Sequence, residues 1–464
     1  MTSQHKACAI LGVRSKKVAF EPRGTLSRVS NPRVAFRRRL SRLGLRDLPR
    51  RGWRGLPRLD LRGDRNYALA MLNGWFVTAG DGFMNSAVVL SSFMAALGAP
   101  NLVIGLLPSI QNGVYMLPQL LVAAKVRHLP RKIVVYRAAS TLRSLSFIGM
   151  AASSALLAGH PAWLIFTFLA MLVLNSAASG VAGLPFWEVV AKTIPVGRRP
   201  TLFGTRQLVG GFIALAEGFA VRAVLASSIP FPLNYTLLLV LGGSMYTVGY
   251  WVFGLVDEPP DPPAERGRLR DELFALPGTV RLDPDFAAFL RLRIMLAVAT
   301  LSDAFFTVFA LREIHVPQAM IGVFLITLGV VAPTSNLVWT RLNLRNGSRR
   351  IIRIALALGA AAPLAAAFMS QGAAFTYLIV FVLSGIAWNG LGLGLNNHLL
   401  AIAPAAMRPR YIGVTNMLVG LASFAPVVGG QLADLLGYRP VFIIGAGLYA
   451  VCWFMAGRLR RDAL

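Results

Sequence analysis

The chain has 464 residues, of which 55% are hydrophobic and 14% charged, and its mean hydropathy is +0.60. Because soluble globular chains carry about 25% charged residues, this composition excludes an ordinary soluble domain and predicts an all-α, multi-pass membrane protein. The net charge of +28 is shared equally by residues 1–65 and the rest of the chain. In a chain with such an apolar body, this charge favours basic cytoplasmic loops and no nucleic-acid partner. The two cysteines, Cys8 and Cys452, provide neither a disulfide framework nor a metal cluster.

Residues 1–65 are rich in arginine and offer no apolar face to bury. We favour a disordered N-terminal tail in the cytoplasm, or an extension that results from a wrongly assigned start. Two other interpretations stay open, namely an organelle transit peptide and a polybasic segment attracted to anionic lipids.

Twelve apolar runs follow this tail, and most reach the roughly 20 residues that a transmembrane helix needs. They cover residues 67–92, 100–124, 133–157, 162–191, 205–226, 234–256, 288–311, 318–341, 352–369, 374–403, 411–432 and 439–457. Basic residues concentrate in every second connection and at the C-terminal end, whereas the opposite connections contain few. Because positive charge is retained on the cytoplasmic side, both termini are predicted to be cytoplasmic, with the protein in the plasma (inner) membrane.

Residues 257–287 form the one long internal connection. Its first residues, Asp257 to Pro263, include four prolines and cannot be helical, whereas 268–276 is predicted to form a short amphipathic helix on the cytoplasmic surface. The expected layout is therefore two six-helix halves, residues 66–256 and 288–457, and a short cytoplasmic tail, 458–464.

The two halves resemble each other in sequence. Residues 173–211 align with 382–420 without a gap, which pairs Gly183 with Gly392 and Arg199 with Arg408. A duplicated six-helix unit is typical of transporters in which one half rocks against the other around a site at the membrane midplane.

Near the C-terminal end the chain contains a ten-residue motif, Gly430-Gln431-Leu432-Ala433-Asp434-Leu435-Leu436-Gly437-Tyr438-Arg439. Together with the repeat and the long central connection, this motif resembles the G-x-L-A-D-x-x-G-x-R signature of the major facilitator superfamily, and the resemblance covers residues 66–460. The motif lies at the turn between helices 11 and 12. In the loop between helices 2 and 3, Arg127 and Pro130 replace the expected Asp and Gly. The resemblance implies twelve transmembrane helices in two pseudo-symmetric six-helix bundles, with helices 1, 4, 7 and 10 around a central cavity.

Ionisable residues inside membrane spans are functional candidates, because burying a charge in lipid is costly. Asp81 in the first span and Asp303 in the seventh occur in similar patterns, Thr78-Asp81-Asn85 and Thr300-Asp303-Thr307. Offsets of three and four residues place each set on one helix face. The resemblance implies that these faces line the cavity, where both aspartates are candidates for proton coupling. The alternative is that each aspartate only forms a hydrogen bond between helices.

Glu217, in the fifth span, is the third candidate for proton coupling. The alternative is a structural ion pair with Arg143 or Arg222. Glu188, near the cytoplasmic end of the fourth span and close to Lys192, is predicted to form a surface or gating ion pair. The predicted gating and cytoplasmic-loop residues are Arg127, Arg131, Lys132, Glu188, Arg199 and Arg408.

The tenth span contains an unusual number of polar side chains, which either bind a polar substrate or hydrogen-bond between helices. They are Trp388, Asn389, Asn396, Asn397 and His398. Weaker candidates on the same reasoning are Asn112, Tyr115, Asn175, Gln207, Asn336 and Asn416.

The chain contains no phosphate-binding G-x-x-x-x-G-K-[ST] loop and no H-E-x-x-H metal motif, so we expect no ATP hydrolysis, no metal, no cofactor and no enzyme activity. The predicted function is a monomeric, proton-coupled secondary transporter of a small solute that works by alternating access, with drug or metabolite efflux as the first guess and uptake still open. The alternative is a non-transporting member of the same fold, such as an assembly factor or sensor.

Overall fold

The fold is described from a computed structural model. It describes residues 65–119, 122, 126, 128–262, 283–372, 374–404 and 407–460, together with the backbone but not the side chain of Pro409. The predictions about residues 1–64, the 268–276 helix and Arg127 lie outside the described residues. Every regular element in the described residues is helical, which confirms the all-α prediction.

The elements before the central connection include two broken spans followed by long helices. They are α2 (Arg65–Asp81), η3 (Ser86–Leu90), α3 (Ser91–Ala96), α4 (Asn101–Ser109), η4 (Ile110–Val114), α6 (Ile133–Leu156), α7 (Pro161–Thr193), η5 (Val196–Arg198), α8 (Arg199–Leu225) and α9 (Leu233–Gly254). Proline occupies the first turn of α7 and of α8, where its missing N–H costs no helix hydrogen bond.

The elements after the central connection begin with a capped helix, because the Asp283 side chain accepts a hydrogen bond from Phe286 N (3.0 Å). They are α12 (Pro284–Ala299), η6 (Thr300–Phe305), α13 (Phe306–Arg312), α14 (Met320–Ala367), α15 (Leu378–Ile402), α16 (Arg408–Ala422), α17 (Ala425–Leu436) and α18 (Tyr438–Ala456).

Eight helical stretches among the described residues are long and apolar enough to cross a membrane. The predicted spans 318–341 and 352–369 both lie within α14, which consists of two helices that meet at a kink. The kink is at Gly347, whose backbone is not helical and has a φ of 73°. Glycine adopts this left-handed backbone without strain, so the chain needs no intervening loop. The twelve-span count stays a prediction.

The two aligned repeat segments make matching contacts. The Arg199 guanidinium donates hydrogen bonds to Ile194 O (3.0 Å) and Ala191 O (2.5 Å), which ends α7. Arg408 donates to the aligned carbonyls, Ala403 O and Leu400 O (both 3.4 Å), at the end of α15. Both arginines, predicted as gating residues, therefore act as C-terminal helix caps in this structure.

The buried hydrophobic residues in the described part of the chain form three clusters. The largest takes residues from both sides of the central connection, among them Phe93, Ile104, Phe309 and Phe442. The other two are confined to one side each, within residues 70–256 and within 286–459. We call the end of the molecule with the common cluster the closed end, and the end with the two separate clusters the divided end.

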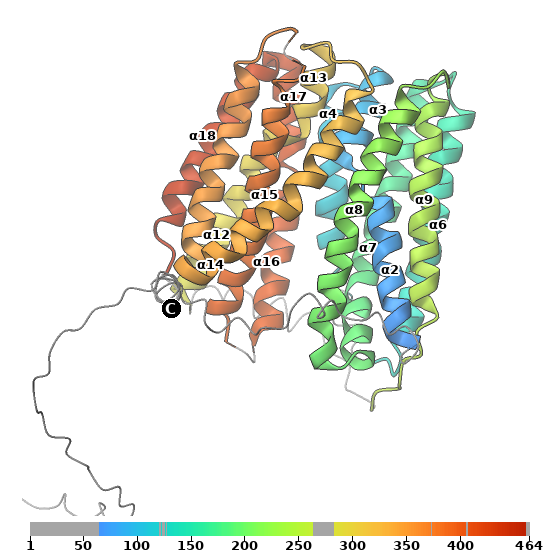
Figure 1. Cartoon of the computed structure of the whole chain (residues 1–464), viewed down its shortest axis with the longest axis vertical. Helices are drawn as coiled ribbons and strands as arrows, with labels where there is room; N and C mark the ends of the chain where they lie inside the picture. The colour runs from blue at the N-terminus through green and yellow to red at the C-terminus, as the bar shows by residue number, and fades with distance from the viewer. Residues whose placement is uncertain are drawn as a thin grey trace, which may run out of the picture. The chain divides into compact units, whose positions relative to one another are not determined.

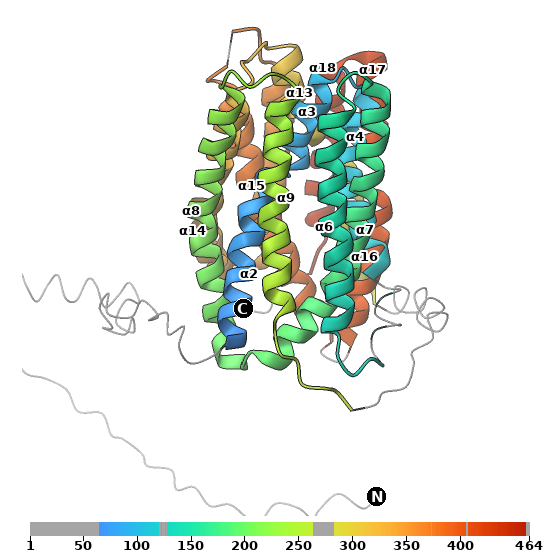
Figure 2. The same ribbon diagram turned by 90° about the vertical axis from the view of Figure 1, so that its right-hand side faces the viewer.

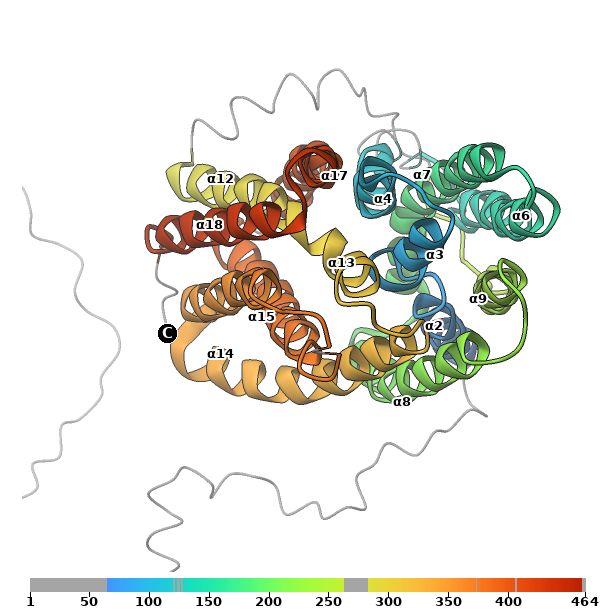
Figure 3. The same cartoon turned by 90° about the horizontal axis from the view of Figure 1, so that it is seen from above.

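The ribbon shows the same distinction. At the closed end, α3, α4, α13 and α17 lie together, and toward the divided end the group of α12, α14 and α16 diverges from the group of α2, α7 and α8 (Figure 1). Helices α8, α2, α9 and α6 run side by side (Figure 2). Seen from above, α17 lies beside α4 and α14 beside α8 (Figure 3).

Candidate functional site

The first predicted span is broken where its acidic residue lies. Helix α2 ends at Asp81, and Asn85 begins η3 by accepting hydrogen bonds from Ala87 N (3.1 Å) and Val88 N (3.0 Å). The continuous helix face predicted through Thr78, Asp81 and Asn85 is therefore wrong, because the Asn85 cap starts a separate helical segment. The three residues nevertheless line one cavity together.

The break connects α2 to Glu217 of α8. Gly82 N, which follows Asp81, donates a hydrogen bond to Glu217 Oε1 (3.1 Å). Glu217 is buried, with 4% of its surface exposed. Its hydrogen-bond partner is thus a backbone amide, and not Arg143 or Arg222 as the structural alternative required.

One cavity of about 390 Å³ lies within the segments that precede the central connection. We call it the first cavity. Its volume lies in the range of small-molecule sites. Its wall is formed by the two broken spans and by helices α6 and α7, and Tyr246 is the lining residue from α9. The polar and charged lining residues are Asp81, Asn85, Gln111, Asn112, Tyr115, Arg143, Asn175, Ser176, Ser179 and Tyr246.

A second cavity of about 330 Å³ lies between α2, α8 and α14, and therefore involves both sides of the central connection. Its polar wall includes Thr78, Arg206, Gln207 and Glu217, and its α14 wall is apolar, from Leu325 to Pro333. Asp81 and Asn85 line both cavities. Asp81 is therefore the acidic residue that the two cavities share.

Two arginines in these walls were missed as site residues. Arg143 lies with its Cζ 3.8 Å from the centroid of the Tyr250 ring, a cation–π distance. Arg206 donates a hydrogen bond to Ala70 O (3.3 Å) and its Cζ lies 5.6 Å from the Phe186 ring centroid. Both interact electrostatically with Asp81. Cations inside apolar runs were the available signal, since the cost of burying charge applies to them as to acids.

Asp81 and Asp303 have different surroundings. The Tyr246 hydroxyl hydrogen-bonds to Asp81 Oδ1. Asp303, which is half-buried in η6, accepts a hydrogen bond from the Tyr449 hydroxyl (2.7 Å) and contacts Ser302 and Trp388. Asp303 lines neither cavity. The geometry groups Glu217, rather than Asp303, with Asp81.

The polar residues of the tenth span, in α15, line neither cavity. Asn389 donates to Gly385 O within its own helix (2.8 Å), and buried His398 contacts the Ser348 hydroxyl (2.9 Å). Asn396 and Trp388 are exposed, and Asn397 is half-buried. Their predicted role in a substrate cavity stays a prediction.

Several of the remaining candidates form hydrogen bonds between segments. Thr307 donates to Ala87 O (2.7 Å) and Asn416 donates to Gln119 (3.0 Å), so both join the two sides of the central connection. Asn175 donates to Ser146 (2.9 Å) while also lining the first cavity. Thr300 and Asn112 donate hydrogen bonds to nearby carbonyls of their own segments, Ala297 O and Pro108 O.

The ten-residue motif lies at the closed end. Asp434 Oδ1 and Oδ2 accept hydrogen bonds from Asn101 N and Leu102 N (both 3.1 Å), which are unpaired donors at the start of α4. A Cβ on Gly430 would overlap Asn101 O, so glycine permits this close approach. Gly437 ends α17 with a φ of 83°, and Arg439 donates to Met369 O (3.3 Å).

Arg312 adds a second set of bonds at the closed end. It donates to Asn101 Oδ1 (3.1 Å), Ala99 O (2.8 Å) and the Tyr438 hydroxyl (3.3 Å). Tyr438 also donates to Asn101 Oδ1 (2.7 Å). The start of α4 is therefore bonded to residues of α13, α17 and α18.

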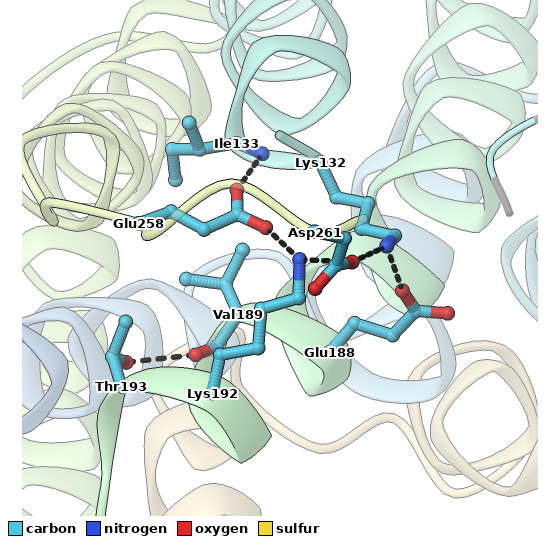
Figure 4. A network of polar contacts seen from close by, with 8 residues as sticks. All are labelled: Lys132, Ile133, Glu188, Val189, Lys192, Thr193, Glu258 and Asp261. Carbon is cyan, nitrogen blue, oxygen red and sulfur yellow. Dashed lines mark hydrogen bonds and ion pairs between the residues drawn. The ribbon is translucent and has the colours of Figure 1, made fainter. Parts of the chain in front are cut away.

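A charged network lies at the divided end (Figure 4). Lys132 pairs with Asp261 and with Glu188 (3.2 Å), and Lys192 pairs with Glu258 (2.5 Å) and Asp261 (2.6 Å). Glu258 also accepts from Ile133 N (2.7 Å). The predicted ion pair of Glu188 thus exists, but its partner is Lys132 and not Lys192. The hydrogen bonds from both lysines lower the pKa of Asp261, which lies outside the membrane spans.

A model of the Major Facilitator Superfamily matches residues 70–426 and, in a second match, 311–463. The chain belongs to the Major Facilitator Superfamily. As the sequence resemblance implied, it is an integral membrane protein of a transporter family with multiple membrane-spanning helices. No curated protein matches the chain significantly.

Solved structures of transporters share the fold of this superfamily member at low identity. A mutant of the nucleoside transporter NupG has a TM-score of 0.67 and 13% identity, covering 85% of this chain and 100% of that one. A POT family transporter in complex with 5-aminolevulinic acid has a TM-score of 0.66 and 12% identity, covering 84% and 95%. D-xylose-proton symporter has a TM-score of 0.64 and 14% identity, covering 86% and 98%. The family and these neighbours together support a secondary transporter.

Proposed function

We propose that this chain moves a small solute across the membrane by proton-coupled alternating access, with Asp81 as the central coupling residue. The observation that carries the proposal is that Asp81 lines both cavities and stands next to Gly82, which binds Glu217. The solute binds in the first cavity, where amides and hydroxyls accompany the charged groups. Efflux of a drug-like compound or metabolite is the direction that we propose.

The coupling step depends on how water reaches a carboxyl group. A carboxyl group shielded from water favours its protonated form, and one open to water releases its proton. Asp81 is exposed to its cavities in this structure, whereas Glu217 is buried beside it. A change of access that covers Asp81 therefore promotes proton uptake. Asp303, paired with Tyr449 outside the cavities, has at most a supporting role.

Alternating access needs two rigid halves that contact each other at one end at a time. We propose that residues 66–256 and 288–457 are these halves, each of six transmembrane helices, and that the divided end faces the cytoplasm together with both termini. The separate hydrophobic clusters and the basic loops at this end support an inward-facing arrangement. A monomer in the inner membrane, with lipid as its other partner and no cofactor, is the proposed working unit.

The test is transport by purified protein in proteoliposomes, with and without an imposed pH gradient, on a screen of labelled amines, amino acids, sugars and nucleosides. Asp81→Asn, Glu217→Gln and Asp81→Asn with Asp303→Asn are compared with wild type at equal incorporation. We expect the Asp81 and Glu217 variants to lose gradient-driven accumulation by about tenfold or more while retaining solute exchange, because an amide cannot release a proton at these pH values.

Asp285→Asn is the matched control, since Asp285 is an exposed carboxylate paired with Arg460 and lines neither cavity. Unchanged pH-dependent accumulation in the Asp81 variants would assign these carboxylates a purely structural role. If wild type moves no solute of the screen in either direction, the non-transporting alternative replaces the proposal.

A further inference from the structure

Arg143 is a charged residue that lines the first cavity. A guanidinium has five N–H donors. Arg143 Nε is buried and has no hydrogen-bond partner among the described residues. The Tyr250 ring centroid lies 3.8 Å from Arg143 Cζ, and a ring on the face of the guanidinium restricts this group without using its in-plane donors.

Asp81, whose charge is opposite to that of Arg143, lines the same cavity. Tyr246 hydrogen-bonds to its Oδ1, and the same Tyr246 ring lies 6.0 Å from Arg143 Cζ. Tyr246 stacks on Phe147 with centroids 5.1 Å apart and planes only 5° apart, so its position is well defined. Asp81 and Arg143 line the cavity without forming a direct ion pair with each other, as far as the described residues are concerned. The cavity therefore presents a carboxylate and a guanidinium that remain separate.

The groups between these charges are suited to a small solute with an apolar part. The cavity volume is about 390 Å³, and Asn112, Tyr115 and Asn175 supply polar atoms. Met84, Met150 and Leu172 supply apolar surface in the same wall. Methionine adapts to irregular ligand shapes, so this part of the wall does not demand one particular skeleton.

We propose that the first cavity binds a zwitterionic solute, whose ammonium group contacts Asp81 and whose carboxylate contacts Arg143. This inference rests on the proposed transport function and specifies its substrate class. Arginine binds a carboxylate through two parallel N–H···O bonds, which favours a planar acid group at that position. A solute with one charge leaves the other protein charge without a partner in the covered site, which is costly, whereas a zwitterion compensates both.

The inference favours a zwitterion over a cationic solute, because a cation alone compensates the charge of Asp81 but not that of Arg143. It also distinguishes the two cavities. In the second cavity Arg206 already donates to Ala70 O and contacts Phe186, and the α14 wall is apolar.

The experiment measures binding to the full-length protein in detergent, without any gradient, by thermal shift and by displacement titration. The probes are matched trios on one carbon skeleton, such as phenylalanine, phenethylamine and 3-phenylpropanoate. Further trios are built on alanine, leucine, γ-aminobutyrate and a dipeptide, which vary the distance between the charges. We expect at least one zwitterion to bind about tenfold or more tightly than both its amine and its acid.

Two variants then assign the charges. Arg143→Gln should reduce the affinity for the zwitterion to that of the matched amine, and Asp81→Asn to that of the matched acid. Arg143→Lys, which retains the charge but loses the bidentate geometry, should give an intermediate affinity. Arg137→Gln is the matched control, because Arg137 lies on the same helix, donates to Gly254 O (2.7 Å) and lines neither cavity.

Equal binding of amine and zwitterion, an unchanged affinity in a folded Arg143→Gln protein, or the absence of binding by every zwitterion of the panel would overturn the inference. These results are independent of the transport test. A protein that binds zwitterions but shows no accumulation contradicts the proposed function alone, whereas one that accumulates a singly charged amine contradicts the substrate class alone.

Discussion

The two ends of the molecule are stabilised by different kinds of contact. At the closed end, hydrophobic residues from both sides of the central connection share one cluster, and Asp434 bonds to the start of α4. At the divided end, the ion pairs of Lys132 and Lys192 connect α6 and α7 to Glu258 and Asp261, which lie at the start of the central connection. The difference teaches that pairs of opposite charges stabilise the segments before and at the central connection, while hydrophobic packing and the capping of backbone groups connect the two sides of that connection.

The largest loss of stability is expected from Lys192→Met, which acts at the divided end. It removes the cation beside Glu258, whose side chain is fully buried, and leaves that carboxylate with only the Ile133 N–H. Breaking a buried ion pair costs about 3–5 kcal/mol, and the partial exposure of Lys192 places the expected loss near the lower value. Thermal and chemical unfolding in detergent measure it.

Replacing Glu258 by Gln in the Lys192→Met background should restore part of the stability, because no unpaired charge then remains. The control is Arg131→Met, at an exposed neighbour of Lys132, which should change stability little. A Lys192→Met protein as stable as wild type would mean that the network does not rigidify this end.

Gly430→Ala tests the packing of the closed end. The added Cβ overlaps Asn101 O, and relieving such overpacking costs about 1–3 kcal/mol. Because α4 and α17 must separate, a cysteine placed at buried Ser109 of α4, in a background without the native cysteines, should react faster with a water-soluble thiol reagent. Gly447→Ala in α18 is the control, since its Cβ meets nothing within 4 Å. Equal reaction rates in the two variants would contradict the prediction.

Asp434→Ala removes two acceptors from the first turn of α4 without adding bulk. Loss of such a cap costs about 1 kcal/mol. We expect a smaller rise in Ser109-site reactivity than in Gly430→Ala, and a melting temperature close to wild type. Asp434→Asn retains one acceptor oxygen, so its Ser109-site reactivity should lie between that of wild type and that of Asp434→Ala. Faster reaction in the asparagine variant than in the alanine variant would exclude capping as the cause.

The smallest effect concerns pH at the divided end. The pKa of Asp261 is lowered by its lysine partners, so its contribution to stability is present above the unfolded pKa of about 4 and is lost as pH falls through the folded pKa. Because Asp261 is partly exposed, the contribution is about 0.5 kcal/mol. Melting curves of wild type and Asp261→Asn should differ at pH 6 and converge near pH 3. A difference that grows on acidification would reverse the assigned sign.

Much of the architecture could be predicted from the sequence, because apolar length and repeat spacing are local signals. The aligned pair Arg199 and Arg408 makes equivalent caps in the two aligned segments, as the sequence match leads one to expect. The break after Asp81 was not predicted, because Thr78, Asp81 and Asn85 were placed on one face of an uninterrupted helix. The stretch Gly80-Asp81-Gly82, followed by Asn85, is a turn signal with a cap and was the available evidence.

The candidate site was less predictable, because its contacts join distant segments. Asp81 was found from its position in an apolar run, but its partner Tyr246 is 165 residues away. Lys132 and Glu188 pair across two helices, so the nearer Lys192 was the wrong choice. Nothing local indicates which arginine within the apolar runs lines a cavity together with Asp81, and Arg143 is identified only once its neighbours are known.

Asp434 has a further consequence that concerns helix dipoles. Its negative charge lies in the last turn of α17, where a helix carries partial negative charge of its own and repels an anion. The start of α4, which carries partial positive charge, lies against it at the closed end. When the two helices separate, the carboxylate keeps the repulsion of its own helix and loses the attraction of the other. The charge of Asp434 therefore favours contact between α4 and α17 for two reasons. The start of α4 attracts it in the closed arrangement, and only the repulsion by the end of its own helix remains when the two helices separate.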